Sequence, residues 1–133
     1  MIQISPERDG LLTDFAKETL KDRYLVGEET PQEGLARAAT AFSDDEAMAQ
    51  RIYDYASKQW LSFATPVLSN APNRKDWAEI YEQNFAPERY DTARGLPISC
   101  FLNYVPDSRE GLGNHYIENI WLGSSGGGIG GYW

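Results

Sequence analysis

The sequence contains one cysteine, one histidine and no long apolar run, and each scarcity excludes a class of protein or site. One cysteine cannot form a disulfide within the chain, so Cys100 is either a small buried side chain or a thiol with its own chemistry. His115 has no second histidine and no cysteine at metal-ligand spacing, so we interpret it as a helix-surface residue and expect no metal site.

Membrane and secretion signals are also missing. No apolar stretch approaches the ~20 residues that cross a bilayer. The first ten residues lack the basic start and apolar stretch of a signal peptide. We therefore expect a cytoplasmic protein that does not contact a membrane.

Basic residues are few, because 12 lysines and arginines stand against 20 acidic residues and give a net charge of −8. Binding to nucleic acid draws most of its free energy from lysine and arginine against phosphates, so we expect no nucleic-acid partner. The 133 residues, 41% of them hydrophobic, suffice for one modest core. Small ligands and protein partners are favoured.

Residues 1–62 predict a helical bundle. Apolar residues recur at helical intervals through residues 11–24, and Gly27 follows as a stop. Residues 30–33 read as a capping box with proline at the first helical position, and residues 43–46 repeat the device. We interpret the apolar side chains at helical spacing as core: Leu11, Leu12, Phe15, Leu20, Tyr24, Leu35, Ala38, Ala39, Phe42, Met48, Ile52, Tyr55, Ala56 and Trp60.

Residues 63–133 are organised differently and form the second predicted region. Residues 64–70 are short and marked by Pro66, so we expect an extended segment that ends in a turn. Residues 74–93 return to helical spacing and predict an inserted helical segment whose role stays unassigned. Residues 98–105 are the best strand candidate. A helix capped by Asp107 or Ser108 follows, with apolar positions along one face.

The sequence closes on a glycine-rich run, residues 126–131, which is interrupted only by Ile129. Such a backbone can approach a phosphate or a sugar closely, and it also occurs in ordinary flexible tails. The run fits no dinucleotide-binding fingerprint and lacks the lysine of a P-loop. We predict a loop here, and the glycines alone leave its function open.

Four segments occur in an order that is typical of one family: residues 63–70, 94–102, 106–108 and 125–130. Together they resemble the catalytic large (alpha) subunit of ribonucleotide reductase, and the similarity covers nearly the whole chain. The resemblance implies a radical enzyme that reduces ribonucleotides to deoxyribonucleotides inside a ten-stranded α/β barrel. We therefore expect a mainly helical α+β chain, in which the bundle is followed by the first strand and helix of such a barrel, completed by another chain.

The resemblance also implies an active site. Cys100 matches one of two redox thiols that end as a disulfide, because a thiol can donate hydrogen to a substrate radical and then be regenerated by exchange. The substrate's phosphates and sugar would contact Thr65, Ser99 and Gly128. Hydroxyl groups and a bare backbone suit anionic oxygens in a tight pocket.

Regulation and dimerisation are implied in the same way. A nucleoside triphosphate or deoxynucleotide effector would bind at Asp107, Ser108 and Arg109. The following helix would pack across a dimer of large subunits through Leu112, Tyr116, Ile120 and Trp121.

The family's radical-bearing cysteine and second redox cysteine match no position in these 133 residues. We expect the chain to be inactive alone and to be the N-terminal part of a split reductase that assembles with a C-terminal part, or a fragment of a longer chain. The alternative is a non-catalytic nucleotide-binding or protein-interaction module with an inert Cys100. The chain itself is expected to bind no cofactor.

The radical source is left open by the resemblance. A metal-bearing small subunit would make the enzyme class I, and adenosylcobalamin would make it class II. Whether the substrate is a diphosphate or a triphosphate follows from the same choice. We favour class I and a diphosphate.

Overall fold

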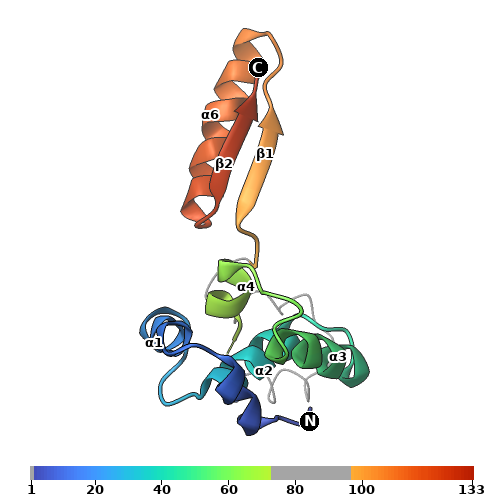
Figure 1. The fold of residues 1–133 in the computed structure, drawn as a ribbon. Coiled ribbons are helices and arrows are strands. Elements are labelled where there is room, and N and C mark those ends of the chain that lie inside the picture. Colours follow the sequence, from blue (N-terminus) through green and yellow to red (C-terminus); the bar gives the residue numbers. More distant parts are fainter. Residues whose placement is uncertain (1, 73–96) are drawn as a thin grey trace.

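The computed structural model describes residues 2–72 and 97–133, and it shows a group of short helices and a strand–helix–strand unit (Figure 1). The inserted helix expected at residues 74–93 lies outside the described residues. The helical part contains η1 (Pro6–Leu11), α1 (Asp14–Arg23), α2 (Pro31–Ala41), α3 (Glu46–Ser57) and α4 (Thr65–Asn70). The second part contains β1 (Cys100–Tyr104), α6 (Arg109–Ser124) and β2 (Gly128–Tyr132). None of the helices in the described ranges has the length and apolar character needed to cross a membrane.

The expected start signal of α2 is confirmed, and α1 also begins at a threonine cap. The hydroxyl of Thr13 accepts the backbone N–H of Ala16 at 3.2 Å, and Gly27 has the positive φ of a left-handed residue, +60°. At α2, the N–H of Glu33 donates to the Thr30 hydroxyl at 3.3 Å while the N–H of Thr30 donates to the Glu33 carboxylate at 2.9 Å. Both halves of the capping box are therefore formed.

The cap of α3 differs from the expectation. Asp45, not Ser43, is the cap, because its carboxylate accepts the N–H of Met48 at 2.7 Å. The hydroxyl of Ser43 is buried and donates to the carbonyl of Ala39 in α2. Burial of Ser43 leaves the longer, exposed carboxylate to satisfy the free N–H groups of α3.

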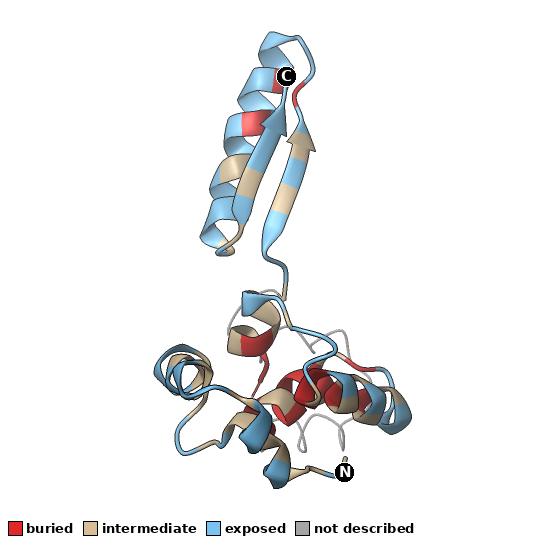
Figure 2. Cartoon of the chain, in the orientation of Figure 1, coloured by how far each residue is buried: buried red, intermediate tan, exposed pale blue. Residues whose placement is uncertain are grey.

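The bundle core is small and rich in alanine, and α2 lies at its centre (Figure 2). The contacts of α2 extend to α1, α3, α4 and η1. Tyr53 is fully buried, whereas Phe15 and Trp60 are exposed to 78% and 72% and Tyr55 to 47%. The assignment of these last three to the core was wrong. Phe15 lies in α1, which has no buried residue, and Trp60 lies beyond the end of α3 at Ser57. Tyr55 is two positions from the buried Tyr53, and residues two apart do not share a helix face. Leu11, at the end of η1, is also exposed.

The segment expected to be extended at residues 64–70 is instead a short helix, α4. Pro66 stands in the first turn, where its missing N–H costs nothing. The N–H groups of Val67 and Leu68 both donate to the carbonyl of Ala64, at 2.9 and 3.3 Å. Leu68 packs in a core cluster with residues of α2. Tertiary packing therefore decides the conformation of a segment too short to form a stable helix alone.

Arg37 is the largest fully buried side chain of the described residues, with its side chain 0% exposed. Its Nε donates to both carboxylate oxygens of Glu29, at 2.9 and 3.1 Å. One terminal nitrogen donates to the carbonyls of Leu68 and Ala71, and the other donates to the carbonyl of Tyr24. One guanidinium thus connects the chain after α1 with the end of α4.

Arg8 of η1 forms an ion pair with Asp54 of α3 at 2.7 Å. The hydrogen bond from Arg8 lowers the pKa of Asp54 below its ordinary value, against the smaller opposing effect of burial. A carboxyl group whose pKa is lowered by folding stabilises the fold above the pKa of the unfolded chain, about 3.9, and loses that contribution as the pH falls through the folded pKa.

We expect Asp54→Asn to destabilise the protein at pH 7 and to have a smaller effect near pH 3, because below the pKa of the unfolded chain part of the contribution of the ionised carboxylate is already lost. Urea unfolding at both pH values measures the difference. Asp22→Asn is the control, because Asp22 pairs with Arg23 at the surface and both side chains are more than 70% exposed. Equal destabilisation by Asp54→Asn at the two pH values would contradict the assignment.

The strand–helix–strand unit is built on a parallel pair. Cys100 lies opposite Gly128, and the register runs through to Tyr104 opposite Tyr132. The strand predicted at residues 98–105 is confirmed with shorter ends, but the loop predicted at the glycine run is wrong, since Gly128–Tyr132 forms β2. Glycine residues can pair in a sheet, and a helix that follows a strand commonly returns the chain to a parallel neighbour. The described residues contain two strands, and the ten-stranded barrel stays a prediction.

Candidate functional site

Cys100 is the first residue of β1, and its thiol is exposed. Exposure alternates along β1, so that Cys100, Leu102 and Tyr104 share one face. Asn103 belongs to the other face, because its amide donates to Glu118 and Asn119 of α6 at 3.2 Å each. The thiol therefore points to the side of the sheet that α6 does not cover.

Two of the expected substrate residues lie next to this thiol. A Cβ added at Gly128 would stand 3.8 Å from the Cys100 sulfur, an ordinary van der Waals contact, so this glycine lies directly beside the thiol. The N–H of Gly128 donates to the carbonyl of Ser99 at 2.9 Å. Ser99, Cys100 and Gly128 are thus brought together at one end of the strand pair.

Thr65 is not joined to this cluster by any hydrogen bond among residues 2–72 and 97–133. It begins α4, and its carbonyl accepts the hydroxyl of Ser69 at 2.9 Å. Its role in binding substrate stays a prediction.

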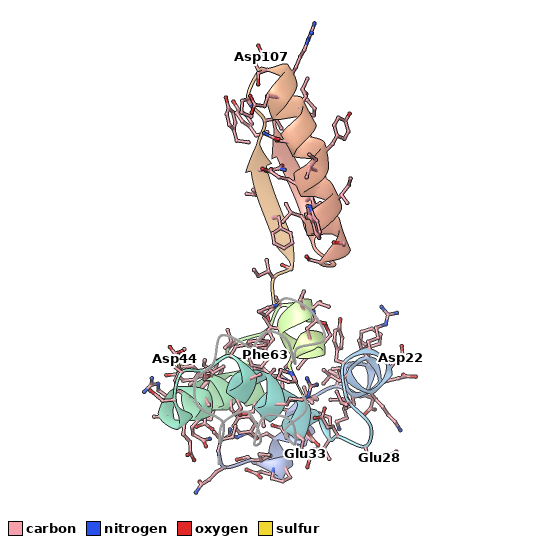
Figure 3. All side chains as sticks on the ribbon, turned by 180° about the vertical axis from the view of Figure 1, so that it is seen from behind. Asp22, Glu28, Glu33, Asp44, Phe63 and Asp107 are labelled. Carbon is pink, nitrogen blue, oxygen red and sulfur yellow. The ribbon has the colours of Figure 1, made fainter. Side chains whose placement is uncertain are left out.

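The three expected effector residues lie at the other end of β1, at the turn into α6. Figure 3 shows Asp107 at this turn. Ser108 is the cap of α6, since its hydroxyl accepts the N–H of Gly111 at 2.9 Å. Asp107, Ser108 and Arg109 are all exposed. The turn therefore presents a carboxylate and a guanidinium to solvent, a pair that can meet a ribose hydroxyl and a phosphate.

Gly111 and Gly113 provide a matched test of how this turn is packed. A Cβ at Gly111 would lie 2.5 Å from the backbone carbonyl oxygen of Pro106, whereas a Cβ at Gly113 would meet nothing within 4 Å. We expect Gly113→Ala to stabilise the protein by about 0.5–1 kcal/mol through helix propensity. Gly111→Ala is expected to destabilise it by about 1–3 kcal/mol, because backbone must move to admit the methyl group. Thermal unfolding measures both, and stabilisation by Gly111→Ala would contradict the packing described.

The four residues expected at a dimer interface lie on the outward face of α6. Tyr116, Ile120 and Trp121 are exposed to 67%, 71% and 71%, and Leu112 to 39%. The buried side of the helix carries Gly111 and His115 instead. Within the described residues the apolar face has no cover, and its packing across a dimer stays a prediction.

His115 is not the surface residue that the sequence predicted, since it is only 9% exposed. The amide of Asn119 lies 3.0 Å from its Nε2, and the ring of Trp133 meets it edge-on at 5.3 Å. Room for the imidazole comes from β2, where a Cβ at Gly131 would stand 3.0 Å from its Cε1. The signal was present: residues 111, 115 and 119 repeat at helical spacing on the side of α6 opposite its apolar residues.

Arg37 is the other residue whose importance the sequence analysis missed. It is the one charged residue in an apolar run, Leu35 to Ala39, and such a position is buried only when the charge is paired. Among the described residues, no group of three or more histidine, cysteine, aspartate or glutamate side chains is placed to hold a metal ion. The expectation of a chain without its own metal stays a prediction.

Comparison with known proteins agrees with the helical part and the strand pair. Residues 10–76 match the family profile described as the all-alpha domain of ribonucleotide reductase. The alpha subunit of a class Id ribonucleotide reductase from Actinobacillus ureae has a similar structure, with a TM-score of 0.61 and 27% identity over 91% of this chain and 20% of that one.

Two sequence relatives extend the match. The ribonucleoside-diphosphate reductase large subunit of Invertebrate iridescent virus 3 is 39% identical over 132 residues, which cover 98% of this chain and 18% of that protein. The corresponding alpha subunit of Helicobacter pylori is 30% identical over 138 residues and is covered to 15%. The chain belongs to the ribonucleotide reductase large-subunit family, and it corresponds to the N-terminal portion of that subunit. It spans less than a fifth of the length of these two relatives.

Proposed function

We propose that this chain supplies one redox cysteine and part of the substrate and effector sites of a ribonucleotide reductase, and that it acts only when combined with the C-terminal part of the large subunit. The observation that carries the proposal is the placement of Cys100. Its thiol is exposed at the start of a strand, beside a glycine of the neighbouring strand and away from the covering helix.

The proposed chemistry replaces the 2′ C–OH bond of a ribonucleotide by a C–H bond. The hydroxyl group leaves as water, and two thiols supply two electrons and two protons and end as a disulfide. Cys100 is the only cysteine in the sequence, so its redox partner comes from residues outside these 133. Thr65, Ser99 and Gly128 would hold the phosphates and sugar while the thiol acts.

A regulatory site is proposed at the opposite end of β1. Asp107 would accept a hydrogen bond from the ribose hydroxyl of a nucleoside triphosphate or deoxynucleotide effector, and Arg109 would face its phosphates. Ser108 would act through the start of α6, which it caps. An effector here could influence Cys100 along a strand of only five residues.

Exposed apolar surface supports the proposed partners. Two-stranded parallel sheets are unusual alone, because parallel strands are normally covered on both faces. Leu102 is 90% exposed and Tyr132 is 72% exposed on the uncovered face. We assign this face and the open edges to the C-terminal part of the subunit, and the outward face of α6 to a second large subunit.

The names of the relatives favour one radical source. One solved relative is called class Id, and the sequence relatives are called ribonucleoside-diphosphate reductases. We therefore propose a ribonucleoside diphosphate as substrate and a metal-bearing small subunit as the source of the radical, with adenosylcobalamin as the alternative. Such an assembly would work in the cytoplasm.

Native mass spectrometry of the protein, purified gently from its host, tests the assembly. The expected result is a complex with a larger polypeptide that carries further cysteines. Recovery of the chain alone would favour a fragment of a longer chain or the non-catalytic module instead.

A further inference from the structure

We propose that Arg37 is a positioning residue for Thr65, because it holds the end of the helix on which Thr65 stands. The inference rests on the proposed function, in which Thr65 contacts the substrate. Arg37 lies in α2 and takes no part in the proposed reaction. It would act on substrate binding through α4.

The contact with α4 is made at the carbonyl end of that helix. One terminal nitrogen of Arg37 donates to the carbonyl of Leu68 at 3.0 Å and to the carbonyl of Ala71 at 2.8 Å. Carbonyls at the end of a helix have no partner within it, so an outside donor is needed where they are buried. Because α4 has only six residues, its position depends on such contacts more than on its own hydrogen bonds.

The guanidinium is itself held from the other side. Its Nε donates to the carboxylate of Glu29, and its second terminal nitrogen donates to the carbonyl of Tyr24 at 2.9 Å. Glu29 in turn accepts the N–H of Val26 at 3.0 Å. The turn between α1 and α2 therefore fixes the guanidinium, and the guanidinium fixes the end of α4.

Thr65 depends on this arrangement for its direction. Among the described residues, no hydrogen bond involves its hydroxyl, so the helix backbone alone orients it. A shift of α4 would move the hydroxyl with it, and displacements of about 1 Å in a binding group are enough to change affinity strongly.

The test is made in the assembled reductase with Arg37→Lys, which keeps the charge but cannot reach all of these acceptors. We expect the KM for the ribonucleotide to rise about tenfold with kcat changed by less than about threefold, the pattern of a lost binding contact. Arg51→Lys, at an exposed position of α3, is expected to leave both constants unchanged.

A double mutant separates this inference from the function on which it rests. With Thr65→Ala in place, Arg37→Lys should raise KM no further, because the group it positions is gone. An unchanged KM in Arg37→Lys, beside a raised KM in Thr65→Ala, would overturn the positioning role and leave the proposed function intact. An unchanged KM in Thr65→Ala would overturn the substrate contact itself.

Glu29→Gln distinguishes positioning from general stability. It removes the charge partner but keeps the donors to Leu68 and Ala71, so we expect a lower Tm without a raised KM. If Arg37→Lys does not fold, hydrogen exchange in the wild-type assembly gives the answer. Added ribonucleotide should slow exchange at residues 67–71 and at residues 24–29 together, and protection confined to residues 67–71 would overturn the proposal.

Discussion

Cys100→Ser is expected to abolish deoxyribonucleotide formation by the proposed enzyme, assembled from this chain and the rest of the large subunit. We expect a loss of at least about 10³-fold, as for removal of one member of a catalytic unit. A serine hydroxyl can neither form a disulfide nor be regenerated by thiol exchange. The readout is the amount of deoxyribonucleotide formed per assembled complex.

The same substitution should leave the assembly unchanged. Cys100 is exposed, so exchange of sulfur for oxygen opens no cavity in the core. Native mass spectrometry of the variant complex provides this control. Wild-type activity in Cys100→Ser would show that the thiol is inert and would support the non-catalytic module.

Arg37→Met is expected to lower the free energy of unfolding by about 3–5 kcal/mol, the range for breaking a buried ion pair from one side. The substitution leaves the carboxylate of Glu29, only 13% exposed, without its cation. It also leaves the carbonyls of Tyr24, Leu68 and Ala71 without their donor. Against a total stability of about 5–15 kcal/mol, such a loss removes a large share of the stability of the fold.

Urea unfolding measures this change, and Arg51→Met is the matched control. Arg51 is exposed on α3, so its replacement is expected to change stability by less than about 0.5 kcal/mol. Equal effects of the two substitutions would show that the buried contacts of Arg37 contribute little.

Short sequence signals were sufficient to predict the features that depend only on neighbouring residues. The threonine cap at position 30 and the left-handed Gly27 lie where the residues predicted a helix start and a stop. The strand at residues 98–105 and the cap at Ser108 were found for the same reason. The conformation of a cap or a turn is determined by a few neighbouring residues, so it can be predicted from the sequence.

Features that depend on distant contacts were missed. α4 is helical because Leu68 packs on α2 and Arg37 holds the helix end. β2 is a strand because its backbone pairs with the edge of β1. Its glycine-rich sequence has little strand propensity of its own. His115 is buried because Gly131 makes room for it. In each case the deciding residue lies many positions away.

The candidate site also contains features that could be predicted from the sequence and features that could not. The resemblance identified Ser99, Cys100 and Gly128 from their motifs, and the parallel register places them together. The helical spacing alone could not reveal that the apolar face of α6 points outward, because spacing shows only that such residues share a face; the expectation of a dimer interface there came from the resemblance. Which face a helix buries depends on the sheet beneath it.

The most direct test of the account follows the thiol of Cys100 through one turnover. The assembled reductase is reduced, freed of reductant, given one equivalent of ribonucleotide and its radical source, and then alkylated for mass spectrometry. We predict that Cys100 is found in a disulfide in an amount equal to the deoxyribonucleotide formed. Product formed while Cys100 stays fully open to alkylation would contradict the account.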